Sequence, residues 1–346
     1  MTTRDFAAVV AALPKAELHL HLEGAIQPAT VVELAARHGS TVTLADAAAR
    51  YDYADFNGFL DSFRWVTSFL RTPADYALVT ERMADQLLRQ NVVYAEVIVA
   101  VGIMHLRQLD ADAIFAAITA AGRKARERGL RLQWLPDGTW QFGPEAAMEV
   151  AKFAARFKSE GVVGFGMGGD ELALPFDQFT RAYEYAAAQG LHRTAHAGEV
   201  GSPTQIMHAI EPLLAERIGH GLAVCRDAGV LEWLGAWKIP LEVCPTSNLR
   251  TGALARQLSL PKPGIEKHPL KSFFDRGALI ALSTDDPAMF GTTLVDEYAL
   301  CRRLGFDLEQ TLRLMEMSFE AAFLPAEDKR AYLSAFDAKK KELGLV

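Results

Sequence analysis

The amino-acid sequence predicts an α/β fold, a (β/α)8 TIM barrel with additional helices inserted after the first strand. Short apolar runs rich in Val, Ile and Leu recur along the chain, as expected for buried parallel strands. Longer amphipathic segments follow most of them, and this alternation indicates a β/α barrel or a doubly wound sheet. Eight runs fit this description, at residues 17–21, 92–100, 130–136, 162–168, 191–196, 217–220, 239–244 and 278–285.

Helix boundaries fall between these runs. Residues 126–129, Arg-Glu-Arg-Gly, combine basic residues with a glycine and predict the end of a helix before the third run. Ser202 followed by Pro203 predicts a helix start after the fifth run. We found no repeat, low-complexity tract or linker, so we expect residues 1–346 to form a single domain.

Residues 22–91 separate the first two runs, which is far longer than one crossover helix requires. Part of this segment must therefore be an insertion, which we place around residues 40–75. It carries large apolar side chains at near-helical spacing, so it is either a helix packed on the barrel wall or an apolar lid over a pocket. These side chains are Phe56, Phe59, Leu60, Phe63, Trp65 and Phe69.

Composition excludes several classes of protein. Of the 346 residues, 50% are apolar and 23% are charged, as in a globular enzyme with a sizeable core. The net charge of −7 comes without a Lys/Arg block, so we expect no nucleic-acid partner. No leader or membrane span is evident, so we expect a cytoplasmic protein without a membrane partner. Three scattered cysteines suit neither a disulfide framework nor a Cys-rich zinc site, so any metal must use His and carboxylate ligands.

His19 and His21 lie two residues apart in the first predicted strand, so both imidazoles project from one face. This is a spacing found among metal ligands. Taken alone it is weak support, because either ring can be a hydrogen-bonded core residue.

Other polar residues strengthen the prediction. His196, His220 and the pair Asp285–Asp286 each stand at the carboxyl end of a different predicted strand. In a (β/α)8 barrel those ends meet on one face, where active sites are built. Three neutral imidazoles and one carboxylate form a plausible zinc site with a position open to water, so we expect a catalytic metal.

The individual roles remain open from spacing alone. Glu199 is either a proton donor with a raised pKa or an ordinary loop glutamate, and its neighbours in the predicted site favour the proton donor. His220 is either a fourth nitrogen ligand or a base acting on the water. Adjacent residues on a strand face opposite ways, so we expect only one of Asp285 and Asp286 to be a ligand. The other is then free to bind substrate or to cap the turn at Pro287.

The glycine-rich segment 164–171 resembles a phosphate loop only superficially. It lacks the following Lys-Ser/Thr, and it ends in Asp170 and Glu171, which would repel phosphate. A backbone donor facing a flat ligand fits better. The remaining histidines lack comparable neighbours in the sequence and are predicted to be ordinary surface or core residues; they are His38, His105, His192, His208 and His268.

Four motifs together closely resemble the adenosine/adenine deaminase family of the amidohydrolase superfamily. They are Pro-Lys-Ala-Glu-Leu-His-Leu-His-Leu-Glu-Gly-Ala at 14–25, Ala-His-Ala-Gly-Glu at 195–199, Ile-Gly-His-Gly at 218–221 and Ser-Thr-Asp-Asp-Pro at 283–287. The resemblance implies one zinc ion per chain, with the ligands His19, His21, His196 and Asp285. It also implies that His220 orients the attacking water and helps to deprotonate it.

The same resemblance assigns the substrate contacts. It implies that Glu199 protonates purine N1, that Asp286 forms a hydrogen bond with N7, and that the Gly169 amide contacts N3. Phe56, Phe59, Leu60 and Phe63 match the family's apolar lid helix, which favours Phe59 and Phe63 as pocket residues. The implied reaction is hydrolytic deamination of a 6-aminopurine nucleoside, giving an inosine-type product and ammonia.

Two positions bear on the substrate. Glu23 stands where adenosine deaminases typically have Asp and adenine deaminases have Glu, at a position that resembles a ribose-hydroxyl contact. Gly219 resembles the nucleoside enzymes, because adenine deaminases tend to carry Asp there. Segments 166–169 and 242–248 also resemble family members that act on 6-aminodeoxyfutalosine, so this nucleoside and adenine are the alternative substrates.

Two other classes of protein compete with this prediction. A two-metal hydrolase usually needs a Lys or acidic bridge at the end of the fourth strand, where this chain has Gly166, Met167 and Gly168. A non-catalytic zinc- and purine-binding barrel should have lost Glu199 or His220, and both are present. We therefore expect one metal and an active enzyme.

Overall fold

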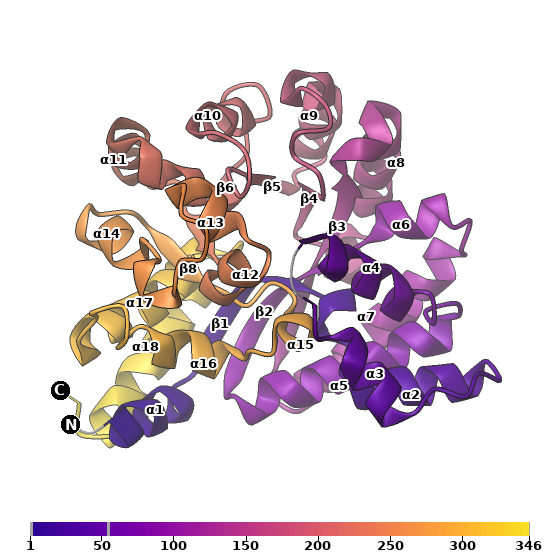
Figure 1. The fold of residues 1–346 in the computed structure, drawn as a ribbon, viewed down its shortest axis with the longest axis horizontal. Coiled ribbons are helices and arrows are strands. Elements are labelled where there is room, and N and C mark those ends of the chain that lie inside the picture. The colour runs from indigo at the N-terminus through magenta and orange to yellow at the C-terminus, as the bar shows by residue number, and fades with distance from the viewer. Residues whose placement is uncertain (1–2, 54–55, 346) are drawn as a thin grey trace.

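A computed structural model describes residues 3–53 and 56–345. Eight parallel strands pair in the order β1 to β8, and an isolated bridge between Leu20 and Asp285 joins the segment directly after β8 back to β1. Figure 1 shows these strands surrounded by helices. The TIM barrel prediction is thus confirmed. The strands are β1 Lys15–His21, β2 Val92–Val99, β3 Arg131–Thr139, β4 Gly164–Gly168, β5 His192–Ala197, β6 Arg217–His220, β7 Leu241–Val243 and β8 Ile280–Leu282.

The helices fill the connections between strands. Those before β4 are α1 Thr3–Ala12, α2 Pro28–Arg37, α3 Leu44–Arg50, α4 Phe56–Thr67, α5 Pro73–Arg89, α6 Val101–Leu106, α7 Ala111–Glu127 and α8 Gly143–Arg156. Those between β4 and β8 are α9 Thr180–Ala188, α10 Pro203–Ile210, α11 Ala228–Trp237, α12 Pro245–Arg250, α13 Ala253–Leu258 and α14 Leu270–Asp275. The chain ends with α15 Pro287–Phe290, α16 Leu294–Leu300, α17 Leu308–Ala321 and α18 Ala326–Glu342.

Local sequence explains where several helices begin and end. The Ser202 side chain accepts a hydrogen bond from the backbone N–H of Gln205, which confirms the predicted start of α10. Thr43 caps α3 in the same way through the N–H of Asp46. Helix α7 ends at Glu127, and Gly129 then takes a φ of 94°, which glycine adopts without steric cost.

Two strand ends differ from the prediction by three residues. Strand β3 extends to Thr139 instead of ending at residue 136, so Asp137 belongs to the barrel. Strand β8 ends at Leu282 instead of reaching residue 285, and Asp285 beyond the strand lies in the left-handed region with a φ of 68°. Asp285 and Asp286 therefore do not alternate on an extended strand. The expectation that they face opposite ways assumed such a strand, and this assumption was wrong.

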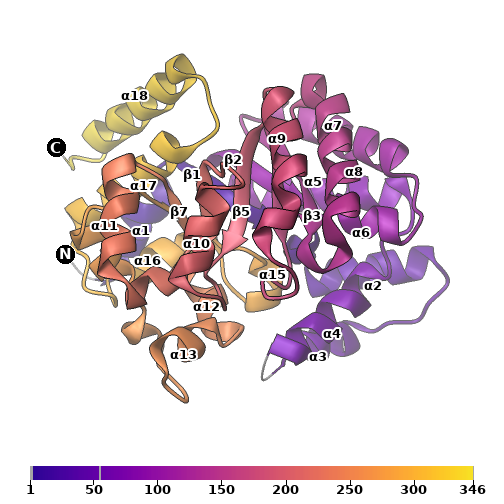
Figure 2. The same cartoon turned by 90° about the horizontal axis from the view of Figure 1, so that it is seen from above.

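The insertion after β1 contains helices α2, α3 and α4, while α5 packs on β2 and α7 as the crossover helix. Figure 2 shows α3, α4, α12 and α13 at one end of the barrel and α18 at the other. Among the described residues, none of the helices has the length and apolar character needed to span a bilayer.

Candidate active site

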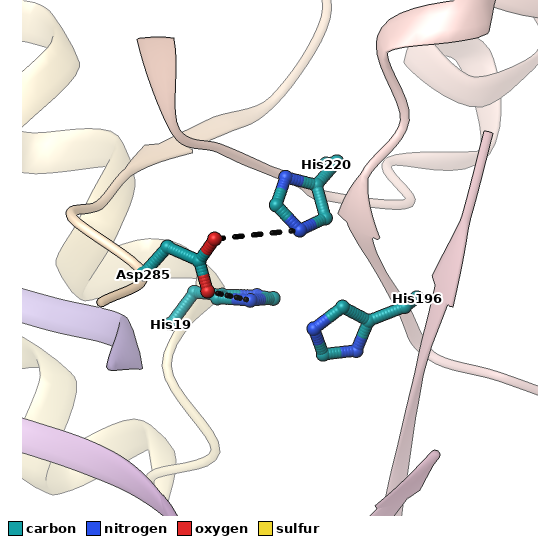
Figure 3. A group of neighbouring side chains, drawn as sticks. All are labelled: His19, His196, His220 and Asp285. Carbon is teal, nitrogen blue, oxygen red and sulfur yellow. Dashed lines mark ion pairs between the residues drawn. The ribbon is translucent and has the colours of Figure 1, made fainter. Parts of the chain in front are cut away.

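Four side chains from separate strand ends converge at one end of the barrel (Figure 3). His19, His196, His220 and Asp285 each offer one ligand atom, and these atoms all lie within 4.8 Å of one another. His21 joins them, since its Nε2 lies 3.2 Å from Asp285 Oδ1 and 3.4 Å from His196 Nε2. The structure therefore brings together all the residues that the sequence indicated for a metal site.

In two of the histidine rings, a hydrogen bond at Nδ1 leaves Nε2, which faces the cluster, available to bind a metal. His19 Nδ1 lies 2.7 Å from the Glu242 carboxylate, and His196 Nδ1 lies 3.1 Å from the backbone carbonyl of Met167. Both partners only accept, so each Nδ1 donates its proton, and in the neutral ring each Nε2 keeps a lone pair. Although burial opposes it, the contacts with Asp285 and Glu242 raise the pKa of His19 to about 10, so a metal that binds its Nε2 displaces a proton. Within the described part of the chain, Nε2 of His19 is buried without a hydrogen-bond partner. Such an orphaned nitrogen fits a metal ligand.

The protonation states of the residues in the cluster also favour metal binding. Burial lowers the pKa of His21 and His196, so both rings are neutral near pH 7. Burial opposes ionisation of Asp285, but its contacts with His19 and His21 hold its pKa well below the usual range. Neutral imidazoles and an ionised carboxylate are a ligand set typical of Zn²⁺.

A buried charge network lies beneath His19 and was not predicted from the sequence. Glu242 on β7 pairs with Arg217 on β6, where the Glu242 Oε1 to Arg217 Nε distance is 2.6 Å. Arg217 also pairs with Glu96 at 2.5 Å, and its guanidinium lies 3.6 Å from the ring centroid of Phe323. Although burial favours the neutral acid, Arg217 lowers the pKa of Glu242 to about 2. Glu242 is thus an ionised acceptor that fixes the orientation of His19.

Glu199 lies beside the cluster, with its Oε2 3.8 Å from His220 Nε2. Burial, together with the charge of Asp285, raises the pKa of Glu199 to about 7. The Oγ1 of Thr251 donates to the Glu199 carboxyl at 3.3 Å. A carboxyl with this pKa can hold and release a proton near neutral pH.

The loop that carries Glu199 is held by Glu171. The Glu171 carboxylate accepts hydrogen bonds from the backbone N–H groups of Gly198, Val200 and Gly201, at 2.6, 2.5 and 2.6 Å. In the sequence, Glu171 is recognisable only as an acid at the end of a glycine-rich segment. No spacing signal links it to residues 198–201, because the two segments meet only when β4 and β5 pair.

Glu23 and Asp286 line the same end of the barrel with unsatisfied acceptors. Glu23 Oε1 accepts from the Ala100 N–H at 3.2 Å, whereas Glu23 Oε2 and Asp286 Oδ1 are buried without partners among the described residues. Burial raises the pKa of Glu23 to about 7, and burial together with Asp285 raises that of Asp286 well above its usual range. Unpaired buried oxygens are costly, which points to a polar ligand that completes their hydrogen bonds.

The inserted helix α4 contacts this region. The ring of Phe59 lies 5.1 Å from that of Phe290 in α15, directly after Asp286, and 6.0 Å from that of Phe63. Phe59 is buried and Phe63 is half-buried, so the apolar stripe packs partly on the barrel and partly beside the site. Tyr53 adds a hydrogen bond from its hydroxyl to the carbonyl of Met289 at 2.6 Å.

Strand β4 contributes backbone instead of side chains. A Cβ at Gly166 would lie 3.0 Å from Asp137 Oδ1, and one at Gly168 would lie 3.1 Å from Asp137 Oδ2. These glycines therefore make room for the Asp137 carboxyl, whose pKa burial raises well above its usual range. Asp137 was missed because the predicted third strand stopped one residue short of it. Gly169 follows β4 with a φ of 85°, which turns the chain at the edge of the site.

The sequence profile described as adenosine deaminase matches residues 14–339 of the chain. The chain belongs to the adenosine deaminase family. Over 341 residues it is 39% identical to an aminodeoxyfutalosine deaminase from Streptomyces coelicolor, covering 96% of this chain and 86% of the relative. An adenine deaminase from Agrobacterium fabrum is 33% identical over 324 residues, covering 93% of this chain and 97% of the relative.

A solved structure supports the same membership of the adenosine deaminase family. An amidohydrolase from Burkholderia ambifaria with bound Zn superposes with a TM-score of 0.86 at 25% identity, covering 98% of this chain and 95% of that one. The resemblance inferred from the four motifs is thus confirmed. The protein is a hydrolase of the deaminase type, with an amidohydrolase-like metal site in a TIM barrel.

Proposed function

We propose that this protein hydrolyses the 6-amino group of a purine nucleoside and releases ammonia, using one Zn²⁺ per chain. The observation that carries the proposal is the position of Glu199, a half-buried carboxyl with a pKa of about 7 placed 3.8 Å from His220 at the edge of the ligand set. An acid in this position can deliver a proton to a ring nitrogen while water adds to the neighbouring carbon.

His19, His21, His196 and Asp285 would hold the metal, because their inward atoms face one another and Nε2 of His19 otherwise lacks a partner among the described residues. Bound zinc lowers the pKa of water and so supplies a nucleophile at neutral pH. The Zn-bound solved relative supports zinc as the metal.

The chain's own groups bind the purine and move protons. Glu199 holds the proton that N1 receives as the water oxygen adds to C6, and His220 orients that water. Asp286 and the Gly169 amide place the ring through N7 and N3. The hydroxyl proton of the adduct passes to the amino group, which departs as ammonia while C6 becomes a carbonyl, and the proton released when the water ionises restores the Glu199 acid.

We also assign a covering role to the insertion around residues 40–75. Phe59 lies against Phe290 beside the aspartate pair, and Phe63 follows it one helical turn later. An apolar helix in this position excludes water from the bound purine and strengthens the polar contacts inside the site.

Among nucleosides, 6-aminodeoxyfutalosine is the substrate that we propose first, because an aminodeoxyfutalosine deaminase aligns over 96% of the chain at 39% identity. Gly219 argues against free adenine. A Cβ at residue 219 would lie 3.0 Å from His19 Cε1 and 3.2 Å from His196 Cα, so the Asp typical of adenine deaminases would crowd the metal ligands. Glu23 is the feature that keeps adenine as the alternative.

The test is ammonia release by zinc-loaded protein from 6-aminodeoxyfutalosine, adenosine, 2′-deoxyadenosine and adenine in parallel, compared by kcat/KM. We expect a nucleoside to lead by orders of magnitude. A lead by adenine would overturn the nucleoside assignment. No release from any of the four, with zinc bound, would favour a non-catalytic purine-binding barrel.

A further inference from the structure

His268 is a buried histidine outside the set that the sequence singled out, and it lies at the start of a hydrogen-bonded chain that ends at His220. The backbone N–H of Leu270 donates to His268 Nδ1 at 3.2 Å. A backbone N–H can only donate, so Nδ1 of His268 carries no proton. Burial lowers the pKa of His268 to about 3, which leaves a neutral ring with its proton on Nε2.

The next link is the side-chain amide of Asn248. Nε2 of His268 lies 3.2 Å from Asn248 Oδ1, and Asn248 Nδ2 lies 3.1 Å from His220 Nδ1. Reversing the amide would set its NH₂ group against the protonated Nε2 of His268, so two buried donors would face each other. The backbone donor of Leu270 thus fixes the amide orientation, and Asn248 donates to His220 Nδ1.

We propose that His268 and Asn248 are positioning residues that keep the proton of neutral His220 on Nε2, the atom that faces the site. This nitrogen lies 3.8 Å from Glu199 Oε2 and 3.9 Å from Asp285 Oδ2. His19 and His196 have the opposite arrangement, because an acceptor faces each Nδ1 and leaves Nε2 with a lone pair. The cluster therefore contains two rings whose Nε2 lone pair can bind a metal and one ring whose Nε2–H can donate a hydrogen bond.

The inference rests on the proposed function and sharpens it. A protonated Nε2 cannot bind a metal, so His220 is excluded as a ligand and His21 takes that place. His220 then orients the attacking oxygen by donating a hydrogen bond to it. This differs from the base that the family resemblance implies, because Nε2 has no lone pair to accept a proton while Asn248 donates to Nδ1.

The first experiment reads the tautomers directly. In zinc-loaded protein labelled with [15N]histidine, two-bond ¹H–¹⁵N spectra distinguish rings protonated at Nε2 from rings protonated at Nδ1. We expect the Nε2–H pattern for His220 and His268, with signals assigned by their loss in His220→Gln and His268→Gln. The Nδ1–H pattern for His220 in the unaltered protein would overturn the proposal.

The Asn248→Asp variant should reverse the tautomer of His220. A carboxylate accepts from both neighbouring rings, so His220 should switch to the Nδ1–H pattern while zinc remains bound. We expect kcat to fall about 10- to 100-fold, in the range typical of residues that orient site groups. An unchanged His220 tautomer in a folded, zinc-loaded Asn248→Asp protein would contradict the assigned network.

A metal titration completes the test without any substrate. His220→Gln should still bind one zinc equivalent, whereas His19→Gln should lose it, as measured by competition with a chromogenic chelator. His38→Gln serves as the control, since His38 bonds to Asp75 at 2.9 Å away from the site. Equal zinc loss in His220→Gln and His19→Gln would make His220 a ligand and overturn the proposal. The tautomer spectra and the zinc titration use no substrate, so their results would be the same if the natural substrate were not a purine.

Discussion

Glu242 accepts a hydrogen bond from His19 at 2.7 Å across the barrel interior, and Arg217 holds that carboxylate in its charged form. Metal-binding histidines commonly depend on such an outer partner. We expect Glu242→Gln to weaken zinc binding about 10- to 100-fold, because a neutral amide no longer balances the charge that His19 shares with the metal. Chelator competition measures the change.

The control for this variant is Glu160→Gln, which removes a surface carboxylate paired with Arg123 at 2.8 Å. Exposed pairs contribute little, so zinc affinity and stability should stay unchanged there. Equal zinc affinity in Glu242→Gln and the control would show that His19 needs no charged partner.

Glu199→Gln removes the proposed proton donor and keeps its shape. Zinc content and thermal unfolding should match the unaltered protein, because Glu199 forms no hydrogen bond to a predicted ligand among the described residues. We expect kcat to fall about 10²- to 10⁴-fold, the range of general acid catalysis. Steady-state ammonia release measures it, and near-normal turnover would remove Glu199 from the mechanism.

The raised pKa of Glu199 also predicts a pH dependence. Burial and the charge of Asp285 move this pKa upward to about 7, so the protonated donor persists to neutral pH instead of being lost near pH 4.5. kcat/KM should therefore hold below about pH 7 and fall as the pH rises further. A profile that rises through pH 7 and stays high in alkali would show that Glu199 acts from its ionised form.

The barrel and its polar face were predictable because they depend on local patterns. Apolar runs and the histidines at their ends are visible in the sequence, and a barrel brings such ends together. Glu171, Glu242 and Asn248 were not predictable, because each acts on a residue at least 25 positions away in the sequence. The geometry of Asp285 was also hidden, since its left-handed φ depends on how the strand end meets β1.

Glu171→Gln tests whether the loop carrying Glu199 needs a carboxylate beneath it. The amide keeps one acceptor but turns a donor toward the N–H groups of residues 198–201, which should cost about 1–3 kcal/mol of stability. We expect a lower Tm and a lower kcat, measured by calorimetry and ammonia release. Asp170→Asn is the neighbouring control, because Asp170 is exposed. Equal effects at both positions would contradict a specific clamp.

Substitution of Glu23 should affect a nucleoside substrate and a free purine base differently. Its Oε2 is buried without a partner among the described residues, while its Oε1 is held by the Ala100 N–H. If a sugar hydroxyl donates to Oε2, Glu23→Gln turns an acceptor into a donor and leaves that hydroxyl poorly paired. Above pH 7, where Glu23 is ionised, a hydrogen bond to its charged carboxylate contributes about 1.5–3 kcal/mol, so kcat/KM for the nucleoside should fall roughly 10- to 100-fold. Adenine has no sugar, so its rate should change little. A parallel loss for adenine and nucleoside would instead show that Glu23 acts by shaping the pocket, because both substrates share only the purine ring.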